Sequence, residues 1–350
     1  MPINNGFKEF LEAQGIPEHT AQKASDSGYY LRGWVNPGTA KTYTTVSDLM
    51  YGNKQFSSSF ETEEFLKYLQ GGKDVFEPLP PFREIVVRNR SELLDILEDS
   101  GRRRYIADGS LSLRGQTGEY RFRREIPNPR RADPEGFELC VMPGLYRQNP
   151  PTYSFATETP DRLSLRLFLN ELEPSNDNVY ADSEFAYDMV RVEQHYATPT
   201  GGLDLSFDID TALFFATHKF TRSNGIATYE PIPAGSHAGV IYCFRFGAPT
   251  VKKSEYLIRD FDLFKAYRPE RILRQACALP MIGDFERNIA ITEIDCVIRL
   301  HRHFEDHGLL TPEHMFPNIR EDKFYGQLLS LKERFPKELE TIVEYAWARG

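Results

Sequence analysis

The sequence predicts an α+β protein preceded by a small accessory region. The chain has 350 residues, of which 40% are hydrophobic and 13% aromatic, and this supply is enough for a sizeable core. Short strand patterns and helix patterns follow one another irregularly, without the even rhythm of a doubly wound parallel sheet. The glycine patterns of the Rossmann turn and of the P-loop are both absent from the sequence, so the two strongest nucleotide motifs are missing.

Residues 1–82 are expected to form the accessory region, with helical and irregular structure. Phe7, Phe10 and Leu11 share one helical face, and Gly15 marks the end of that helix. A polar stretch rich in tyrosine, serine and glycine follows at 28–60, and a second helix at 61–70 ends at a pair of glycines. Prolines at positions 78, 80 and 81 indicate a domain boundary.

Residues 83–330 are expected to form the main domain, and 331–350 a C-terminal helix packed on it. Helices are predicted at 91–101, capped by Asn89 or Ser91, and at 161–172, 183–195 and 208–219. Strands are predicted at 83–87, 110–115, 119–125 and 239–246, and the apolar runs at 270–282 and 288–294 are read as further strands.

Composition narrows the classes of function. The formal net charge is −9, which argues against general coating of nucleic acid. The sequence has no apolar run of membrane-spanning length and no secretory leader pattern, so a cytoplasmic protein without membrane contact is expected. The four cysteines are far apart in sequence, and we expect reduced core thiols and no metal site. His303 and His307 are interpreted as part of a solvated helix face rather than as metal ligands.

One local segment is basic. Residues 102–131 carry nine arginines and three acids, a net charge of +6. Arginine suits bidentate phosphate binding, so the segment predicts an anion site, or alternatively a solvated strand face paired with acids from elsewhere. Arg114 is the strongest candidate, because it ends a predicted strand and precedes Gly115, a residue that lets a ligand approach the backbone.

The segment 193–219 carries the most information. A helix ends near His195, a turn with Pro199 and two glycines follows, and Ser206 precedes a helix capped by Asp208 or Asp210. A hydroxyl at that place can bind a ligand whose anionic group lies at the helix N-terminus. Each polar residue also has a structural interpretation: His195 and Ser206 as helix caps, and Asp204 as a buried turn stabiliser.

Five strings together resemble the FRG domain family, over about residues 83–330. They are LRGQ (113–116), PGLYRQ (143–148), EQHYATPTGGLDLSFDIDTALFFA (193–216), RILRQACAL (271–279) and HGLLTPEHMFPNI (307–319). The order of an early Arg-Gly and a later hydroxyl residue before a helix is also similar to the Arg-Ser-Glu class of ADP-ribosyltransferases. This resemblance implies a split core of mixed and antiparallel sheet with flanking helices.

The resemblance also implies a reaction and its residues. It implies NAD as co-substrate, cleavage of the nicotinamide–ribose bond, and an unknown protein or nucleic-acid acceptor, in a bacterial toxin-like or defence setting. The implied catalytic residues are Ser206 and either Glu270 or Gln275. Residues implied to bind the cofactor are Arg114, Gly115, Gln116, Arg147, His195 and Asp204.

Two alternatives remain open at this point. One is a non-catalytic module that binds a nucleotide or a protein and acts as an effector, and it predicts a basic pocket without a carboxylate at the ribose. The other is a nucleic-acid binder or nucleic-acid enzyme. It predicts that the arginines of 102–131 form a long exposed stripe and that binding depends steeply on salt.

Overall fold

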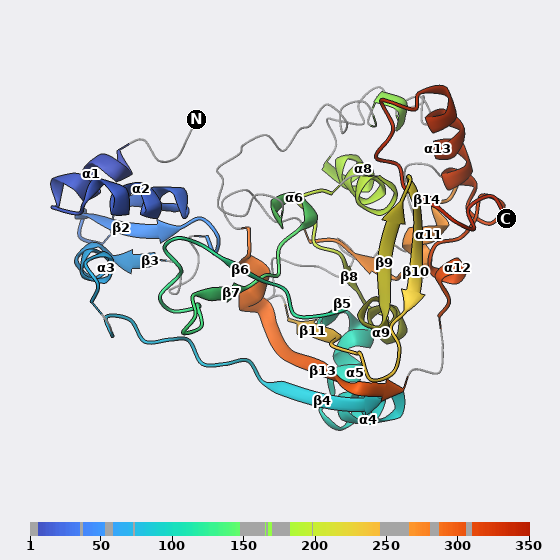
Figure 1. Ribbon diagram of the computed structural model, residues 1–350, viewed down its shortest axis with the longest axis horizontal. Coiled ribbons are helices and arrows are strands. Elements are labelled where there is room, and N and C mark those ends of the chain that lie inside the picture. Colours follow the sequence, from blue (N-terminus) through green and yellow to red (C-terminus); the bar gives the residue numbers. More distant parts are fainter. Residues whose placement is uncertain are drawn as a thin grey trace. The chain divides into compact units, whose positions relative to one another are not determined.

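The computed structural model divides the chain into two compact units, whose elements are labelled in Figure 1. It describes residues 6–35, 38–52, 59–72, 74–147, 165, 167–169, 183–197, 199–245, 266–280, 287–305 and 310–350. The first unit comprises 1–81, 120–157 and 282–292, and the second comprises 82–119, 158–281 and 293–350. The sequence placed a boundary at almost the same point, after residue 82, but assigned 120–157 and 282–292 to the main domain.

The first unit combines three helices with a small antiparallel sheet. The helices are α1 (Phe7–Ala13), α2 (Glu18–Asp26) and α3 (Thr62–Leu69), and the sheet has the order β1 (Tyr29–Val35), β2 (Thr42–Asp48) and β3 (Ser59–Glu61). The remaining elements are the antiparallel ribbon of β6 (Arg121–Arg123) and β7 (Phe137–Leu139), and the short helix α6 (Gly144–Arg147). The helices near 7–14 and 61–70 are confirmed. The stretch 28–60, expected to be irregular, forms all three strands, because its Thr, Tyr and Val residues favour extended backbone.

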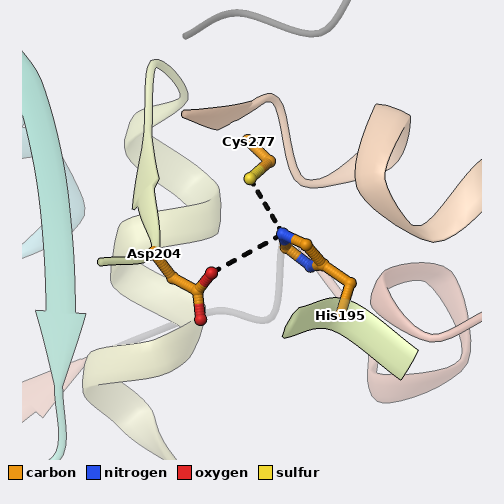
Figure 2. Close-up of side chains that lie close together, drawn as sticks. All are labelled: His195, Asp204 and Cys277. Atoms are coloured by element: carbon orange, nitrogen blue, oxygen red, sulfur yellow. Dashed lines mark hydrogen bonds and ion pairs between the residues drawn. The ribbon is translucent and has the colours of Figure 1, made fainter. Parts of the chain in front are cut away.

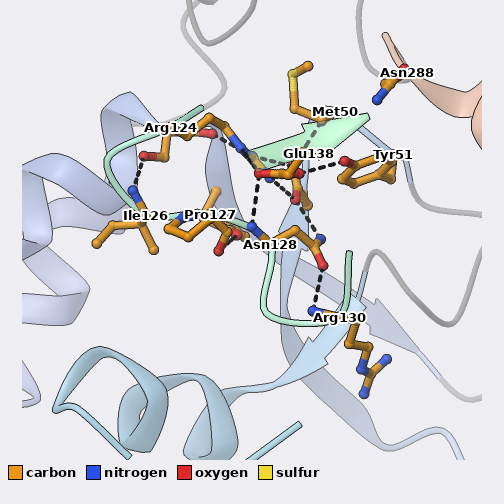
Figure 3. Close-up of polar contacts among 12 residues, drawn as sticks. Met50, Tyr51, Arg124, Ile126, Pro127, Asn128, Arg130, Glu138 and Asn288 are labelled. Carbon is orange, nitrogen blue, oxygen red and sulfur yellow. Dashed lines mark hydrogen bonds and ion pairs between the residues drawn. The ribbon is translucent and has the colours of Figure 1, made fainter. Parts of the chain in front are cut away.

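A buried charge network explains why residues 120–157 belong to this unit. The Arg124 guanidinium donates to both carboxylate oxygens of Asp48 and to both of Glu138, each at 2.9 Å, and these side chains have no exposed area. Asn128 donates to Asp48 at 2.9 Å, and Tyr51 donates to Glu138 at 2.5 Å (Figure 3). A buried guanidinium needs this neutralisation, so the later segment completes the core of the earlier one.

The second unit is built on a six-stranded sheet with the order β12–β8–β5–β11–β13–β4. The β4–β13 pair is parallel, and the other described pairs are antiparallel. In chain order the strands are β4 (Glu84–Asn89), β5 (Ser112–Gln116), β8 (Leu205–Ser206), β11 (Val240–Phe244), β12 (Cys277–Ala278) and β13 (Ile294–Glu305). A separate sheet contains β9 (His218–Ser223), β10 (Ile226–Pro231) and β14 (Glu344–Tyr345).

Helices accompany these sheets, and two of them begin at caps that the sequence indicated. Asn89 accepts from the Glu92 amide at 2.9 Å, and Asp208 accepts from the Thr211 amide at 2.7 Å. The helices are α4 (Arg90–Asp99), α5 (Arg102–Asp108), α8 (Ser183–Tyr196), α9 (Ile209–Thr217), α11 (Glu270–Arg274), α12 (Pro312–Met315) and α13 (Lys323–Arg334). The fold is therefore α+β with mixed and antiparallel sheets. None of the helices in the described part of the chain has the length and apolar character that crossing a bilayer requires.

Several local predictions were wrong. The run 270–282 was expected to be a strand, but it starts with the helix α11, and β12 is only two residues long. Residues 289–293 form a 3-10 helix (Ile289–Glu293) before β13, and His303 lies on that strand rather than on a helix. The C-terminal helix expected at 331–350 is absent, since α13 ends at Arg334. Pro336 explains this, because proline cannot continue a helix. Most of the helix predicted at 161–172, and His307, lie outside the described residues.

Candidate functional site

A cavity of about 190 Å³ lies within the second unit, where β5, β8 and β12 meet α9. Its walls come from segments that are far apart in the sequence. The lining residues are Leu113, Arg114, Gly115, His195, Asp204, Leu205, Ser206, Thr211, Ala212, Phe215, Tyr229, Gln275 and Cys277. The lining therefore combines a guanidinium, an imidazole, a carboxylate, a thiol, a hydroxyl and an amide with two aromatic rings.

Arg114 is half-buried in β5 and reaches the loop before β8. Its Nη1 donates to the backbone carbonyl of Asp204 at 2.5 Å. The neighbouring Gly115 also lines the cavity, but the structure gives the glycine a different reason from the expected one. A Cβ at this position would lie 1.7 Å from the Ala212 carbonyl oxygen and 3.0 Å from the Ala216 nitrogen. Gly115 thus admits helix α9 against the sheet, and the small side chains of Ala212 and Ala216 allow the same approach.

Gln194 organises the turn that precedes β8. Its side-chain oxygen accepts from the Thr200 amide at 2.9 Å and from the Thr200 hydroxyl at 2.7 Å, and its amide nitrogen donates to Asp204 Oδ2 at 2.8 Å. Gly202 is needed here for space rather than for positive φ, since a Cβ would lie 2.6 Å from the Leu279 side chain. Gln194 was not among the residues predicted from the sequence, although it stands beside His195 in the segment 193–219.

His195 lies in the last turn of α8, and Figure 2 shows its ring between two other side chains of the cavity. Its Nε2 is 2.8 Å from the Cys277 sulfur and 3.6 Å from Asp204 Oδ1. The His195 side chain is 6% exposed, whereas that of Asp204 is 41% exposed. Burial lowers the pKa of the His195 imidazole, and this favours a neutral ring.

Ser206 does line the cavity, but its hydroxyl already holds two backbone groups. The Oγ donates to the Gln275 carbonyl at 2.8 Å and accepts from the Asp208 amide at 2.9 Å. Asp208, rather than Ser206, is the N-cap of α9. The Ser206 side chain therefore ties β8 to the end of α11 and orders this wall of the cavity.

The two late candidates have different places. Gln275 lines the cavity, and its side-chain nitrogen donates to the Met315 carbonyl at 3.0 Å. Glu270 begins α11, pairs with Arg268 at 3.0 Å and is absent from the lining. Of the two candidates for the late catalytic residue, the one that lines the cavity is therefore the amide Gln275 and not the carboxylate Glu270.

Two further candidates are not brought to the cavity lining. Gln116 is buried at the end of β5, where its backbone pairs with Val240. Arg147 belongs to the first unit, where its Nε donates to the Met142 carbonyl at 2.7 Å. Six of the nine predicted site residues line the cavity, and three do not. The six are Arg114, Gly115, His195, Asp204, Ser206 and Gln275, and the three are Gln116, Arg147 and Glu270.

Arg271 supports the site from behind and was not recognised from the sequence. It is fully buried, and its Nη1 donates to the His195 carbonyl at 2.6 Å. Its guanidinium carbon lies 4.2 to 5.4 Å from the ring centroids of Tyr196, Tyr325, Tyr345 and Phe316. Cation–π contacts of this kind stabilise a buried guanidinium, so Arg271 fixes the end of α8 that carries His195.

Most arginines of 102–131 have individual partners. Arg102 pairs with Asp295 at 2.7 Å, Arg121 with Asp133 at 2.6 Å, and Arg124 belongs to the buried network of the first unit. Arg130 lies over the rings of Phe60 and Phe76, and Arg131 over that of Tyr51. These contacts agree with the alternative of paired arginines, and they weigh against the long exposed stripe that the nucleic-acid hypothesis predicts.

Comparisons with protein-family models, with curated proteins and with solved structures give no match for this chain. The resemblance to the FRG domain therefore stays a prediction that depends on the motifs.

Proposed function

We propose that this cavity binds NAD and that the protein cleaves the nicotinamide–ribose bond, as an ADP-ribosyltransferase-like enzyme or an NAD glycohydrolase. The observation that carries the proposal is the convergence of Arg114, Ser206 and Gln275 on one cavity. These residues come from three separate strings of the FRG-like pattern. Their shared cavity agrees with the ADP-ribosyltransferase-like arrangement that the resemblance implies.

The chemistry of the lining suits one part of the ligand. Arg114 offers the positive charge that an anchored phosphate requires, and Phe215 and Tyr229 offer aromatic surface. Cleavage develops positive charge on the ribose, which the oxygen of an amide or carboxylate stabilises, and Gln275 and Asp204 carry such groups. The cavity is smaller than the roughly 300–1,000 Å³ typical of pockets for drug-sized ligands, so it encloses only part of a dinucleotide.

The position of Glu270 bears on the type of reaction. A late carboxylate orients the acceptor in the Arg-Ser-Glu class, but here Gln275 rather than Glu270 lines the cavity. This favours hydrolysis over transfer to an acceptor. It also supports a second candidate, a non-catalytic module that binds the nucleotide without cleaving it.

The test combines binding and turnover. Wild-type protein is incubated with labelled NAD, with and without candidate protein and nucleic-acid acceptors, and free nicotinamide, ADP-ribose and labelled acceptor are measured. Arg114→Lys keeps the charge but loses the planar fork, and Arg114→Ala loses both. We expect weaker NAD binding in both, by roughly 10- to 150-fold for the alanine variant, since a hydrogen bond to a charged group contributes about 1.5–3 kcal/mol.

Glu270→Ala serves as the matched control, because Glu270 pairs with Arg268 away from the cavity lining. This variant should retain binding and any turnover, whereas Gln275→Ala should lose turnover. Binding without release of nicotinamide would assign the non-catalytic candidate. Absence of both binding and turnover in the folded wild-type protein refutes the proposal.

A further inference from the structure

Three side chains of different chemistry meet at one wall of the cavity: His195 from α8, Asp204 from the loop before β8, and Cys277 from β12. Figure 2 shows them facing a common point. Their Nε2, carboxylate oxygen and sulfur atoms all lie within 4.8 Å of one another. An imidazole, a carboxylate and a thiolate are the ligand types that bind zinc in proteins.

Contacts with neighbouring residues position each of these three side chains. Residue Cys277 pairs with Ser206 across the β12–β8 ladder, so its position is set by the sheet. Gln194 holds Oδ2 of Asp204, which leaves Oδ1 to face His195. The Gln275 side chain interacts with the His195 ring and is itself held by the bond from its nitrogen to the Met315 carbonyl, at 3.0 Å. Such outer contacts orient the ligands of protein metal sites.

The geometry differs from that of a catalytic cysteine triad. In a triad, the nucleophile and the carboxylate contact opposite nitrogens of the imidazole. Here the Cys277 sulfur and Asp204 Oδ1 both approach the same nitrogen, Nε2 of His195.

We infer that His195, Asp204 and Cys277 form a binding site for a divalent transition-metal ion of the zinc type, with a fourth position open to the cavity. Asp204 Oδ1 is buried and accepts no hydrogen bond from the described residues, so its lone pairs are available to an ion. A bound cation would also favour the thiolate form of Cys277, since a coordinating thiol loses its proton.

The distances are close to those that an ion requires. Zinc bonds of about 2.0–2.3 Å in tetrahedral geometry place nitrogen and oxygen about 3.4 Å apart, and nitrogen and sulfur about 3.6 Å apart. The first distance is 3.6 Å in the structure, and the second is 2.8 Å. Coordination therefore needs a displacement of the Cys277 sulfur by about 0.8 Å, which a small side-chain rotation supplies.

The positive charge of nearby arginines limits the affinity of this site for a metal ion. Arg191 and Arg271 act electrostatically on His195, and Arg114 donates to the Asp204 carbonyl. The carboxylate of Asp204 and a Cys277 thiolate together balance a divalent ion, so binding releases the thiol proton. This site departs from the sequence-based expectation of no metal. It is also independent of the NAD proposal, because binding of the ion alone can be measured.

The test titrates cobalt(II) and then zinc into chelator-treated full-length protein without any nucleotide. We expect equimolar cobalt binding with a thiolate-to-cobalt charge-transfer band in the near ultraviolet, and displacement of the band by zinc. Cys277→Ser should abolish the band, and Asp204→Asn should weaken cobalt binding at least tenfold. Gln275→Ala should weaken it roughly 10- to 100-fold, as loss of an outer contact does.

Cys140→Ser is the matched control, since Cys140 is also a buried thiol but belongs to the first unit. It should keep the band. If Cys277→Ser does not fold, the wild-type spectrum still decides, together with the rise in melting temperature that zinc should cause in the wild-type protein. A wild-type protein without the band, or a band that persists in folded Cys277→Ser, overturns the inference. A failure of NAD binding leaves it untouched.

Discussion

Substitution of Gly115 by alanine should destabilise the second unit, because the new methyl group meets the backbone of α9. The added Cβ would lie 1.7 Å from the Ala212 oxygen and 2.7 Å from its carbonyl carbon. Both are backbone atoms, so no side-chain rotation relieves the clash, and the whole helix has to move. Overpacking usually costs about 1–3 kcal/mol, and we expect the upper end of that range, about 3 kcal/mol.

The assay is thermal unfolding of the full-length protein, followed by circular dichroism. At roughly 2–4 °C per kcal/mol for a unit of this size, the melting temperature should fall by about 6–12 °C. Gly118→Ala is the control, because its Cβ would meet only the Ala238 oxygen, at 3.8 Å. A Gly115→Ala protein that melts within about 1 °C of the wild type, yet loses NAD binding, would refute this packing argument. It would instead support the ligand-approach role that the sequence suggested.

Three further perturbations test other parts of the structure. Arg271→Met should lower the free energy of unfolding by about 3 kcal/mol in urea denaturation, because it removes the cation of the aromatic cage and the bond to the His195 carbonyl. Arg124→Met should cost about 3–5 kcal/mol, since Asp48 stays buried without its cation. Acidification below about pH 6.5 should destabilise the wild type more than His195→Asn, because burial lowers the folded-state pKa of His195, so the unfolded imidazole takes up a proton first.

The two arginine substitutions share one control, and the pH series has another. Arg103→Met removes an exposed arginine that pairs with Glu98 at 3.4 Å, and it should change stability by less than about 0.5 kcal/mol. For the pH series, the difference between wild type and His195→Asn should vanish above about pH 7.5, where both states of the imidazole are neutral. Equal pH profiles for the two proteins throughout would contradict the assignment to His195.

Local signals in the sequence were sufficient for several elements. Asn89 and Asp208 cap helices as their positions indicated, because capping depends on the residues of a single turn. The two short helices of the accessory region and the apolar strand β11 were likewise visible as patterns.

The remaining features depend on contacts between distant segments. The run that starts at Glu270 is apolar enough to be interpreted as a strand. However, Arg271 is surrounded by rings from α8, α13 and β14 and by that of Phe316, which follows α12, and a helix places it there. Nothing near Cys277 in the sequence indicates His195 and Asp204 as neighbours, since the pairing of β12 with β8 brings them together. For the same reason, the sequence did not assign 120–157 to the first unit.

The buried hydrogen bonds of Arg124 limit where this chain can be cut into fragments or exchanged with another protein. Asp48 precedes the proline-rich boundary and Arg124 follows it, with a stretch of the second unit between them. A fragment that ends at Pro81 would contain the Asp48 carboxylate without its cation. A fragment that begins at Phe82 would contain Arg124 without one of its two acidic partners. The accessory region therefore cannot be separated from the rest of the chain without loss of this network, and genetic exchange at that boundary should yield insoluble products.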